Sequence, residues 1–453
     1  MNTPRRILVG LARHRAGLAL ALLVTACRLA QAQPLGLMQA FEAALQHDPT
    51  FHAAMAERDA GREHTTLGRA QLLPSISAQY GTSQNRTHVS SESGPAEQRS
   101  YRSTNTSVQL RQPLYHPEGR AAWQQGQALT AASDARFEAR RQDLIVRLFE
   151  AFSGVLQTQE QVTLAQAQLT ALTEQKRANL QLLAKGEGTR TEVLETDAKH
   201  QMAEAQRIEA QDRLNHARNQ LAAMIGQPVQ ALTPLAEGFS TDPAAGVGLA
   251  QWRETALQDN GVLQSLRWQV QAASEEVRRA RGGHQPRLDL LASVGRSESD
   301  TVSSYRQTYR TQSLGVQLHV PLYDGGAVSA QTRQALARQA QAEAELDSRT
   351  EEVLVELQRQ YQLQQSTGLR VAALDKAAAS GRLLIEATQK SVAGGVRTNL
   401  DVLNARERLT QAESDLAVAR HAHLLAGLRL RLAAGVLSEK DLRELARRFQ
   451  SQP

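Results

Sequence analysis

Large aromatic residues are scarce in this sequence of 453 residues, in which seven Phe, seven Tyr and three Trp make up only 4%. A compact core of that size normally draws on aromatic side chains for much of its buried area. Proline is missing from long stretches that are rich in Ala, Gln, Leu, Arg and Glu. This composition is typical of long, thin helical pairs that bury Ala and Leu along narrow stripes, rather than of several globular domains.

Cysteine and long apolar runs are also scarce. The single cysteine, Cys27, lies near the start, so the rest of the chain offers no thiol for a disulfide, a metal or redox chemistry. No run reaches the roughly 18 apolar residues that a membrane-spanning helix needs. Motifs of zinc proteases, phosphate-binding loops and serine nucleophiles are absent too. We therefore expect neither a helical membrane protein nor an enzyme, and we expect no cofactor and no metal site.

The first 32 residues resemble a secretory signal peptide. Arginines without any acid precede an apolar stretch of 11 residues, AGLALALLVTA, from Ala16 to Ala26. Ala30-Gln31-Ala32 fits ordinary cleavage before Gln33, which we favour. The alternative is a bacterial lipoprotein box, Val24-Thr25-Ala26-Cys27, which would place a lipid on Cys27. In both cases the protein leaves the cytoplasm.

The formal net charge of +6 comes largely from this leader. Residues 1–32 hold five of the 52 basic residues and none of the 46 acidic ones, which leaves 47 basic and 46 acidic residues and a net charge of +1. The charge therefore carries no indication of a nucleic-acid partner.

Two segments recur at nearly the same offset, which indicates a tandem duplication. LRQPLYHPEG at 110–119 is echoed 208 residues later by LHVPLYDGGA at 318–327. GEGTRTEVL at 186–194 is echoed 209 residues later by GVRTNLDVL at 395–403. We therefore divide the chain into a first repeat at 33–235, a second repeat at 236–435 and a C-terminal tail at 436–453.

Each repeat is expected to contain a helix, a β-hairpin and a long helical hairpin. The β-hairpins are predicted at 72–113 and 286–321, with strands of about ten residues, because apolar side chains alternate with small, polar or charged ones there. The helical hairpins are predicted at 118–226 and 324–434. The alternating apolar positions are Ile76, Ala78, Tyr80, Val108 and Leu110 in the first repeat, and Leu288, Leu290, Ala292, Val294, Leu314, Val316, Leu318 and Val320 in the second.

The long helices carry apolar residues in steps of four and three, the 3.5-residue period of a coiled coil. In the first repeat this seam runs through Leu144, Leu148, Ala151, Val155, Thr158, Val162, Ala165, Leu169 and Leu172, and in the second it runs from Val402 to Ala433. A helix of this kind from Glu118 to Ala184 would be roughly 100 Å long. His423 lies on the second seam, where we expect an interhelical hydrogen bond.

Four amphipathic strands cannot close a β-barrel, and an open apolar sheet cannot face lipid. Bacterial barrels begin at eight strands. Three chains with four strands each would give twelve. The pattern therefore predicts a barrel in an outer membrane that is shared between subunits, with the helices in the periplasm.

The duplicated order of parts resembles the TolC family of outer-membrane channel proteins. The resemblance rests on Pro113-Leu114-Tyr115, on PLYDGG at 321–326 and on the turn at 395–403, and it covers about Gly36 to Gly435. It implies a homotrimer with a twelve-stranded barrel and a periplasmic helical tunnel, which docks through an adaptor (membrane fusion) protein on an inner-membrane transporter.

Near its start the sequence is most similar to the type I secretion branch of this family. GLMQAF at 36–41 with Asp48-Pro49, and AERDA at 56–60 leading to Leu72-Leu73-Pro74, carry this likeness. It implies a passive duct that works with an ABC transporter to export a protein such as a repeat-type toxin or hemolysin. Multidrug efflux is the alternative within the family. A structural coiled-coil stalk is the alternative from another class.

The family resemblance also implies roles for the two helical turns. Gly186, Gly188, Thr189, Gly395 and Thr398 would dock the adaptor. Arg397 would pair with Thr191 or Glu192 of the other hairpin to close the periplasmic entrance, and Asp401 would form a threefold carboxylate ring in the lumen. Asn404 stands where relatives with two rings place a second aspartate, and Val392 replaces an aromatic gate residue, so we expect weaker cation selectivity and a looser closure.

Helix capping is the competing interpretation of the acids at these turns. Thr189 with Glu192, and Thr398 with Asp401, both have the spacing of a capping box at a helix that restarts after glycine. The two interpretations are compatible, because a capping carboxylate at a constriction still carries its charge.

Overall fold

The computed structural model describes residues 34–91, 94–236, 248–301, 304–397 and 399–449. The predicted signal peptide, Cys27 and Thr398 lie outside the described residues. The described chain is mainly helical with one sheet of four antiparallel strands, which confirms the predicted fold class. None of the described helices combines the length and the apolar character needed to cross a membrane.

The duplication is visible in the lengths of the elements. Paired elements have 11, 22 and 36 residues in both repeats, and the longest helices have 68 and 67. The first repeat consists of α2 (Leu37–His47), α3 (Pro49–Ala70), β1 (Ser75–Ser91), β2 (Gly94–Tyr115), α4 (Pro117–Ala184) and α5 (Arg190–Ile225). The second consists of α6 (Leu249–Asp259), α7 (Gly261–Gly282), β3 (Arg287–Thr301), β4 (Ser304–His319), α8 (Ala327–Ala393) and α9 (Asn399–Ala434).

Two helices precede the strands of each repeat, where the sequence predicted one. The break lies at equivalent polar residues, Asp48 and Asn260. The Asn260 Oδ1 accepts hydrogen bonds from the backbone N–H groups of Val262 and Leu263, at 3.0 and 3.1 Å. Asp48 precedes Pro49, which has no N–H group to continue the preceding helix. In each repeat a polar side chain, that of Asp48 or Asn260, therefore accepts a backbone N–H group at the start of the second helix.

The strands are also longer than the predicted ten residues, with 15 to 22 residues each. Backbone pairing continues beyond the apolar alternation into segments rich in Ser, Thr, Asn and Gln, such as Thr82↔Thr104 and Ser83↔Ser103. Hydrogen bonds of the ladder involve the backbone and need no apolar side chain. Hydrophobic alternation therefore marked only the part of each strand nearest the helices.

The chain folds as two compact units. One unit spans 53–141 and 252–356 and contains α3, the first part of α4, α7, the first part of α8 and the sheet. Within it α3 and α4 approach closely at glycines. A Cβ atom at Gly68 would lie 2.5 Å from the carbonyl oxygen of Ala122, and one at Gly126 would lie 2.3 Å from that of His64. Glycine is required at both positions because any side chain would push the helices apart.

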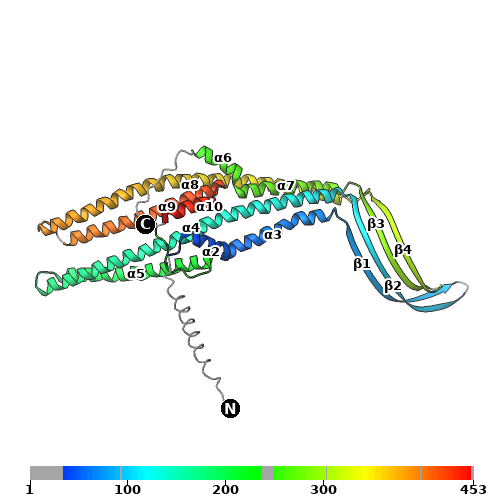
Figure 1. Cartoon of the computed structure of the whole chain (residues 1–453), viewed down its shortest axis with the longest axis horizontal. Coiled ribbons are helices and arrows are strands. Elements are labelled where there is room, and N and C mark those ends of the chain that lie inside the picture. Colours follow the sequence, from blue (N-terminus) through cyan, green and yellow to red (C-terminus); the bar gives the residue numbers. More distant parts are fainter. Residues whose placement is uncertain (1–33, 92–93, 237–247, 302–303, 398, 450–453) are drawn as a thin grey trace, which may run out of the picture. The chain divides into compact units, whose positions relative to one another are not determined.

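Figure 1 shows the four strands side by side, in the order β1, β2, β3, β4. Residues opposite each other in an antiparallel pair share a face. Leu290 pairs with Val316, Ala292 with Leu314, and Ala292 also with Leu110, so the predicted apolar residues of both repeats form one face. This apolar face is exposed in the single chain, with Leu314 76% and Leu318 62% accessible.

The opposite face of the sheet is mostly small and polar, with one ionic cluster near the helices. Asp289 is buried, and its Oδ2 accepts hydrogen bonds from the guanidinium groups of Arg111 at 2.8 Å and Arg287 at 3.1 Å. Arg111 belongs to the first repeat and Asp289 to the second. The cluster therefore ties β2 to β3 at the junction between the repeats.

The second unit contains, of the described residues, 34–52, 142–236, 248–251, 357–397 and 399–449, and it includes the paired long helices. In this unit α4 lies beside α5, and α8 lies beside α9 (Figure 1). Leu169 and Leu172 of the predicted seam form a buried cluster with Ala203 of α5. Leu416 and Ala419 form another with Val371 and Ala378. Small apolar residues at the seam let the helix axes approach, as the coiled-coil period predicted.

Two histidines of α9 are buried in different surroundings. The Nδ1 of His423 lies 3.2 Å from the Thr367 hydroxyl and 3.2 Å from the Gln364 carbonyl oxygen of α8, which confirms the expected interhelical hydrogen bond. His421 is 1% exposed, and its Nδ1 has no hydrogen-bond partner in the described part of the chain. Burial, with a smaller contribution from Arg420, lowers the pKa of His421 to about 4.

The region predicted as a C-terminal tail is folded up to Phe449. It contains α10 (Glu439–Ala446) and a short 3₁₀ helix (Arg447–Phe449). Phe449 is 1% exposed and packs edge-on against Phe149 and Phe152 of α4, with ring centroids 6.1 and 5.7 Å apart. Three of the seven Phe residues therefore gather in one cluster that fixes the end of the chain to the first repeat.

We expect Phe449→Ala to lower the free energy of unfolding by about 3–5 kcal/mol, because it leaves a cavity between buried rings. Leu369→Ala is the control, since Leu369 is 75% exposed, and it should change stability by less than about 0.5 kcal/mol. Denaturant unfolding of the detergent-solubilised protein measures both. Equal effects of the two substitutions would contradict the anchoring role of Phe449.

We expect acid to destabilise the protein through His421. Above pH 6.5 the ring is neutral in the folded and the unfolded chain. As the pH falls from 6.5 towards 4, only the unfolded chain takes up the proton, so the folded state loses up to about 3 kcal/mol. His421→Leu should flatten the pH dependence of the unfolding free energy. An unchanged slope in His421→Leu would disprove the assignment.

Candidate functional site

The turns at 186–194 and 395–403 begin with the same backbone geometry. After α4, Gly186 has a φ of 77°, its N–H donates to the Leu183 carbonyl at 3.0 Å, and the Glu187 N–H donates to the Leu182 carbonyl at 2.9 Å. A left-handed residue with these two bonds ends the helix as a Schellman motif, which favours glycine because it has no Cβ atom.

The turn after α8 repeats this arrangement 209 residues later. Gly395 has a φ of 74°, its N–H donates to the Val392 carbonyl at 3.0 Å, and the Val396 N–H donates to the Ser391 carbonyl at 2.9 Å. The predicted turn glycines Gly186 and Gly395 therefore have equivalent positions in the two repeats. Gly188 has no counterpart of this kind, because Arg397 occupies the equivalent position.

Glu192 caps α5, as the competing interpretation predicted. Its carboxylate accepts hydrogen bonds from the Thr189 N–H at 2.9 Å and the Thr189 hydroxyl at 3.0 Å, while its own N–H donates to that hydroxyl at 3.2 Å. The backbone hydrogen bond from Thr189 is the main cause that lowers the pKa of Glu192. The group is therefore an ionised carboxylate at the start of a helix, where the helix dipole also favours negative charge.

The remaining residues assigned to the gate lie at or near the second turn. Arg397 and Asn404 are exposed, as is Thr191 at the first turn, and Asp401 is half-exposed in the first turn of α9. In the described part of this single chain, Arg397 forms no ion pair with Glu192. The predicted contact between the turns therefore stays a prediction about the assembled protein.

Sequence reasoning missed the polar contacts that join α4 to α5 close to the first turn. The Lys176 ammonium group contacts Asp197, and the Asn179 amide donates to the Thr196 hydroxyl at 2.8 Å. The second hairpin has an ion pair at other positions, between Arg382 and Glu413 at 2.8 Å. Opposite charges on the two helices of each hairpin were visible in the sequence. Which of them pair depends on how the two helices align.

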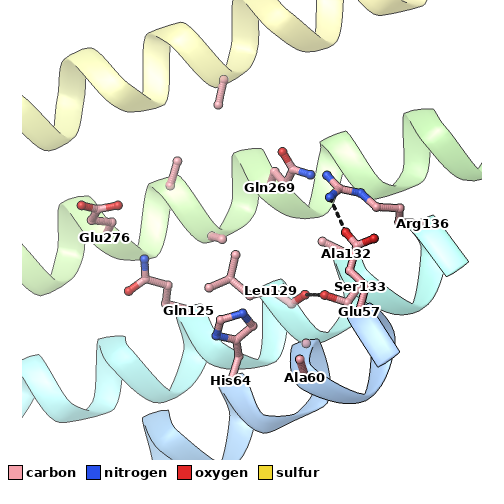
Figure 2. Close-up of a pocket in the computed structure, with 14 residues that line it drawn as sticks. Glu57, Ala60, His64, Gln125, Leu129, Ala132, Ser133, Arg136, Gln269 and Glu276 are labelled. Carbon is pink, nitrogen blue, oxygen red and sulfur yellow. Dashed lines mark hydrogen bonds and ion pairs between the residues drawn. The ribbon is translucent and has the colours of Figure 1, made fainter. Parts of the chain in front are cut away.

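A cavity of about 650 Å³ lies between α3, α4, α7 and α8 in the unit that contains the sheet. Figure 2 shows Glu57, His64 and Arg136 among the side chains that line it. Arg136 pairs with Glu57 at 3.0 Å, and the other acid, Glu276, pairs with Arg338 at 2.9 Å. Both carboxylates are therefore already paired, and His64 beside them does not complete a group of three residues that could hold a metal ion among the described residues.

Metal binding has no support elsewhere in the described chain either. Its His, Cys, Asp and Glu residues form no group of three or more that could hold a metal ion. The arrangement at the turns can present charge and end helices, and among the described residues there it provides no set of side chains for covalent chemistry.

The sequence matches the outer membrane efflux protein family over residues 40–227 and 252–436. These two segments correspond to the two repeats. The chain belongs to this family. The resemblance drawn from the sequence is thereby confirmed, and membership places the protein in the bacterial outer membrane.

Two relatives of the chain are named as protease secretion proteins. The proteases secretion protein PrtF of Dickeya chrysanthemi is 41% identical over 428 residues, which cover 93% of each chain. The alkaline protease secretion protein AprF of Pseudomonas aeruginosa is 39% identical over 422 residues, which cover 92% of this chain and 88% of AprF.

The fold is shared with solved outer-membrane channels. The crystal structure of the Campylobacter jejuni CmeC outer membrane channel superposes with a TM-score of 0.76, covering 91% of this chain and 89% of CmeC. Sequence identity is only 15%, so this likeness concerns the fold alone.

Proposed function

We propose that the protein is the outer-membrane duct of a type I secretion system, formed by three copies of this chain. The open sheet carries the proposal. Its four strands have a linear order, so β1 and β4 are edges with unpaired backbone groups, and its apolar face is exposed. In lipid such edges are tolerated only when a barrel closes, and twelve strands from three chains meet that requirement.

Export of a protein is supported by the two relatives that are named for protease secretion. Both align with more than nine-tenths of this chain at about 40% identity. We expect an exported protein as the cargo, with a protease, toxin or hemolysin as candidates. An adaptor protein would bind the helical turns, and an inner-membrane ABC transporter would supply the energy. The duct itself needs no catalytic residue.

Drug efflux is the second candidate function. It is favoured by the description of the family as efflux proteins and by the fold shared with CmeC. A coiled-coil stalk is disfavoured because a stalk has no use for an amphipathic four-stranded sheet. Neighbouring genes for an ABC transporter, an adaptor and a secreted protein would favour secretion over efflux.

We further propose that the turns form the closable periplasmic entrance. The exposed Arg397 is free to approach Thr191 or Glu192 of another hairpin, where the ionised Glu192 carboxylate would attract it. Asp401 would form a ring of three carboxylates around the axis, and Asn404 would leave the entrance with a single such ring. Gly186, Gly188, Thr189, Gly395 and Thr398 would belong to the surface that the adaptor grips.

Deletion of the gene should abolish export of its protein substrate, and the wild-type chain should restore it. The purified protein should form trimers and conduct ions in planar bilayers. A variant that lacks both β-hairpins, 75–115 and 287–319, should do neither. A soluble, trimeric hairpin-deletion variant, together with a wild-type protein that conducts no ions, would instead support the stalk. Restored drug resistance without restored protein export would support efflux.

Arg397→Ala and Glu192→Ala should each raise the conductance of single channels, because each removes one partner of the proposed closure. Thr189→Ala is the matched control, since it breaks the helix cap but keeps the Glu192 charge. An equal rise in Thr189→Ala would assign the effect to capping. Unchanged conductance in both Arg397→Ala and Glu192→Ala would exclude the closure.

A further inference from the structure

The apolar face of the sheet ends at a pair of arginines. Along β3 this face presents Leu288, Leu290, Ala292 and Val294, and the next residue on the same face is Arg296. Along β4 it ends at Leu314, and Gln312 and Arg310 follow. The apolar segment of β3 extends over about 20 Å along the strand, which corresponds to a height of about 15 Å at the strand tilt of outer-membrane barrels, within their apolar band of about 25 Å.

Arg296 and Arg310 lie directly opposite each other on neighbouring strands. Their Cβ atoms are therefore about 5 Å apart, and like charges at such positions destabilise a sheet. Both side chains are exposed. Arg296 has a carboxylate 3.5 Å away, that of Glu298, whereas Arg310 has no ion pair among the described residues. The pair therefore retains excess positive charge that an anion would neutralise.

Further positive charge lies on the same face towards the ends of the strands remote from the helices. Arg86 on β1 and Arg102 on β2 are exposed and lie on diagonally neighbouring positions, at Arg86↔Ser100 and Gln84↔Arg102. Glu298 is the acid among the described side chains of this face. The charge thus collects beyond the apolar segment and not within it.

Among the side chains that the structure describes, those of the opposite face do not share this pattern. Its charged cluster, Arg111, Arg287 and Asp289, lies at the end nearest the helices and is internally paired. Beside the arginine pair, that face carries uncharged residues, among them Gly295, Ser297 and Thr311. The arginine pair therefore lies on the face that meets lipid in the proposed barrel, and not on the face that lines its lumen.

Tyr80 lies in the same register as the arginine pair, through Tyr80↔Thr106, Thr106↔Arg296 and Arg296↔Arg310. Its side chain is 70% exposed on the apolar face. Tyrosines of outer-membrane barrels collect at the boundary between hydrocarbon and headgroups. Arginine on the lipid face is costly at the membrane centre and nearly neutral at this boundary. The arginines, which directly follow the apolar segment, therefore fit the level of the headgroups.

We propose that Arg296 and Arg310 bind phosphate groups of the phosphorylated glycolipid in the outer leaflet. This proposal rests on the proposed function, because it requires the apolar face to lie in the outer membrane with the helices on the periplasmic side. Guanidinium groups bind phosphate oxygens through paired, charge-assisted hydrogen bonds. A phosphate between the two arginines would also remove the repulsion across the strands.

The full-length protein in detergent is titrated with diphosphorylated lipid A and with enzymatically dephosphorylated lipid A, and binding is followed by native mass spectrometry. Wild type should bind the phosphorylated lipid at least about tenfold more tightly than Arg296→Gln/Arg310→Gln does. Arg296→Lys/Arg310→Lys should retain part of the affinity, because the charge stays and the paired geometry is lost. The control Arg349→Gln/Arg443→Gln removes two exposed arginines from the helices and should bind like wild type.

Equal binding by wild type and Arg296→Gln/Arg310→Gln would overturn the proposal, as would equal binding of the two lipids. Displacement of lipid A by millimolar inorganic phosphate alone would also overturn it, because it would reveal an anion site without selection for lipid. Conductance of the same samples in phosphatidylethanolamine bilayers separates the two proposals. A wild-type protein that conducts ions but binds the two forms of lipid A equally would contradict the lipid site. A wild-type protein that conducts no ions would contradict the proposed duct.

Discussion

The two edges of the four-stranded sheet impose the main constraint on this protein. A strand edge exposes unpaired N–H and C=O groups, and the sheet in question also exposes an apolar face. A water-soluble monomer would pair or cover such edges. A chain that belongs to an outer-membrane family can instead satisfy them by sharing a barrel with further copies of itself. The proposed trimer, duct and lipid contacts all depend on this requirement.

Duplication explains how one chain supplies both a sheet and long paired helices. Each repeat contributes one β-hairpin and one helical hairpin, and equivalent turn glycines, Gly186 and Gly395, end the longest helices. The ionic cluster of Arg111 with Asp289 then joins β2 of one repeat to β3 of the next. Each helical hairpin buries its own seam, whereas the two β-hairpins of the repeats join in one four-stranded sheet.

Much of the fold followed from periodicity, and the errors have physical causes. The seam residues Leu169 and Leu172 are buried as the coiled-coil step predicted, because that step depends only on helix geometry. Strand ends were missed because backbone pairing continues through polar residues such as Ser83. The helix break at Asn260 was missed because its effect lies in a side-chain cap, which composition alone does not reveal.

The candidate site was likewise predicted from the sequence only in part. The Thr189 to Glu192 spacing identified a capping box, and the structure contains it. The pairing of Asn179 with Thr196 was not visible in the sequence, because it depends on how two helices align across their seam. A contact between Arg397 and Glu192 depends on neighbouring hairpins of an assembly, which neither periodicity nor a single chain determines.

The sequence by itself determined the duplication, the element types, the amphipathic faces and the turns, since each of these depends on local spacing and on residues such as glycine and threonine. Tertiary structure alone decided which distant residues meet. It buried His421 beside Phe449, with ring centroids 6.3 Å apart, folded the chain end against Phe149, and set Arg296 opposite Arg310. These residue pairs are set by strand register and helix packing. Both depend on the contacts of many residues together, so a short stretch of sequence does not predict them.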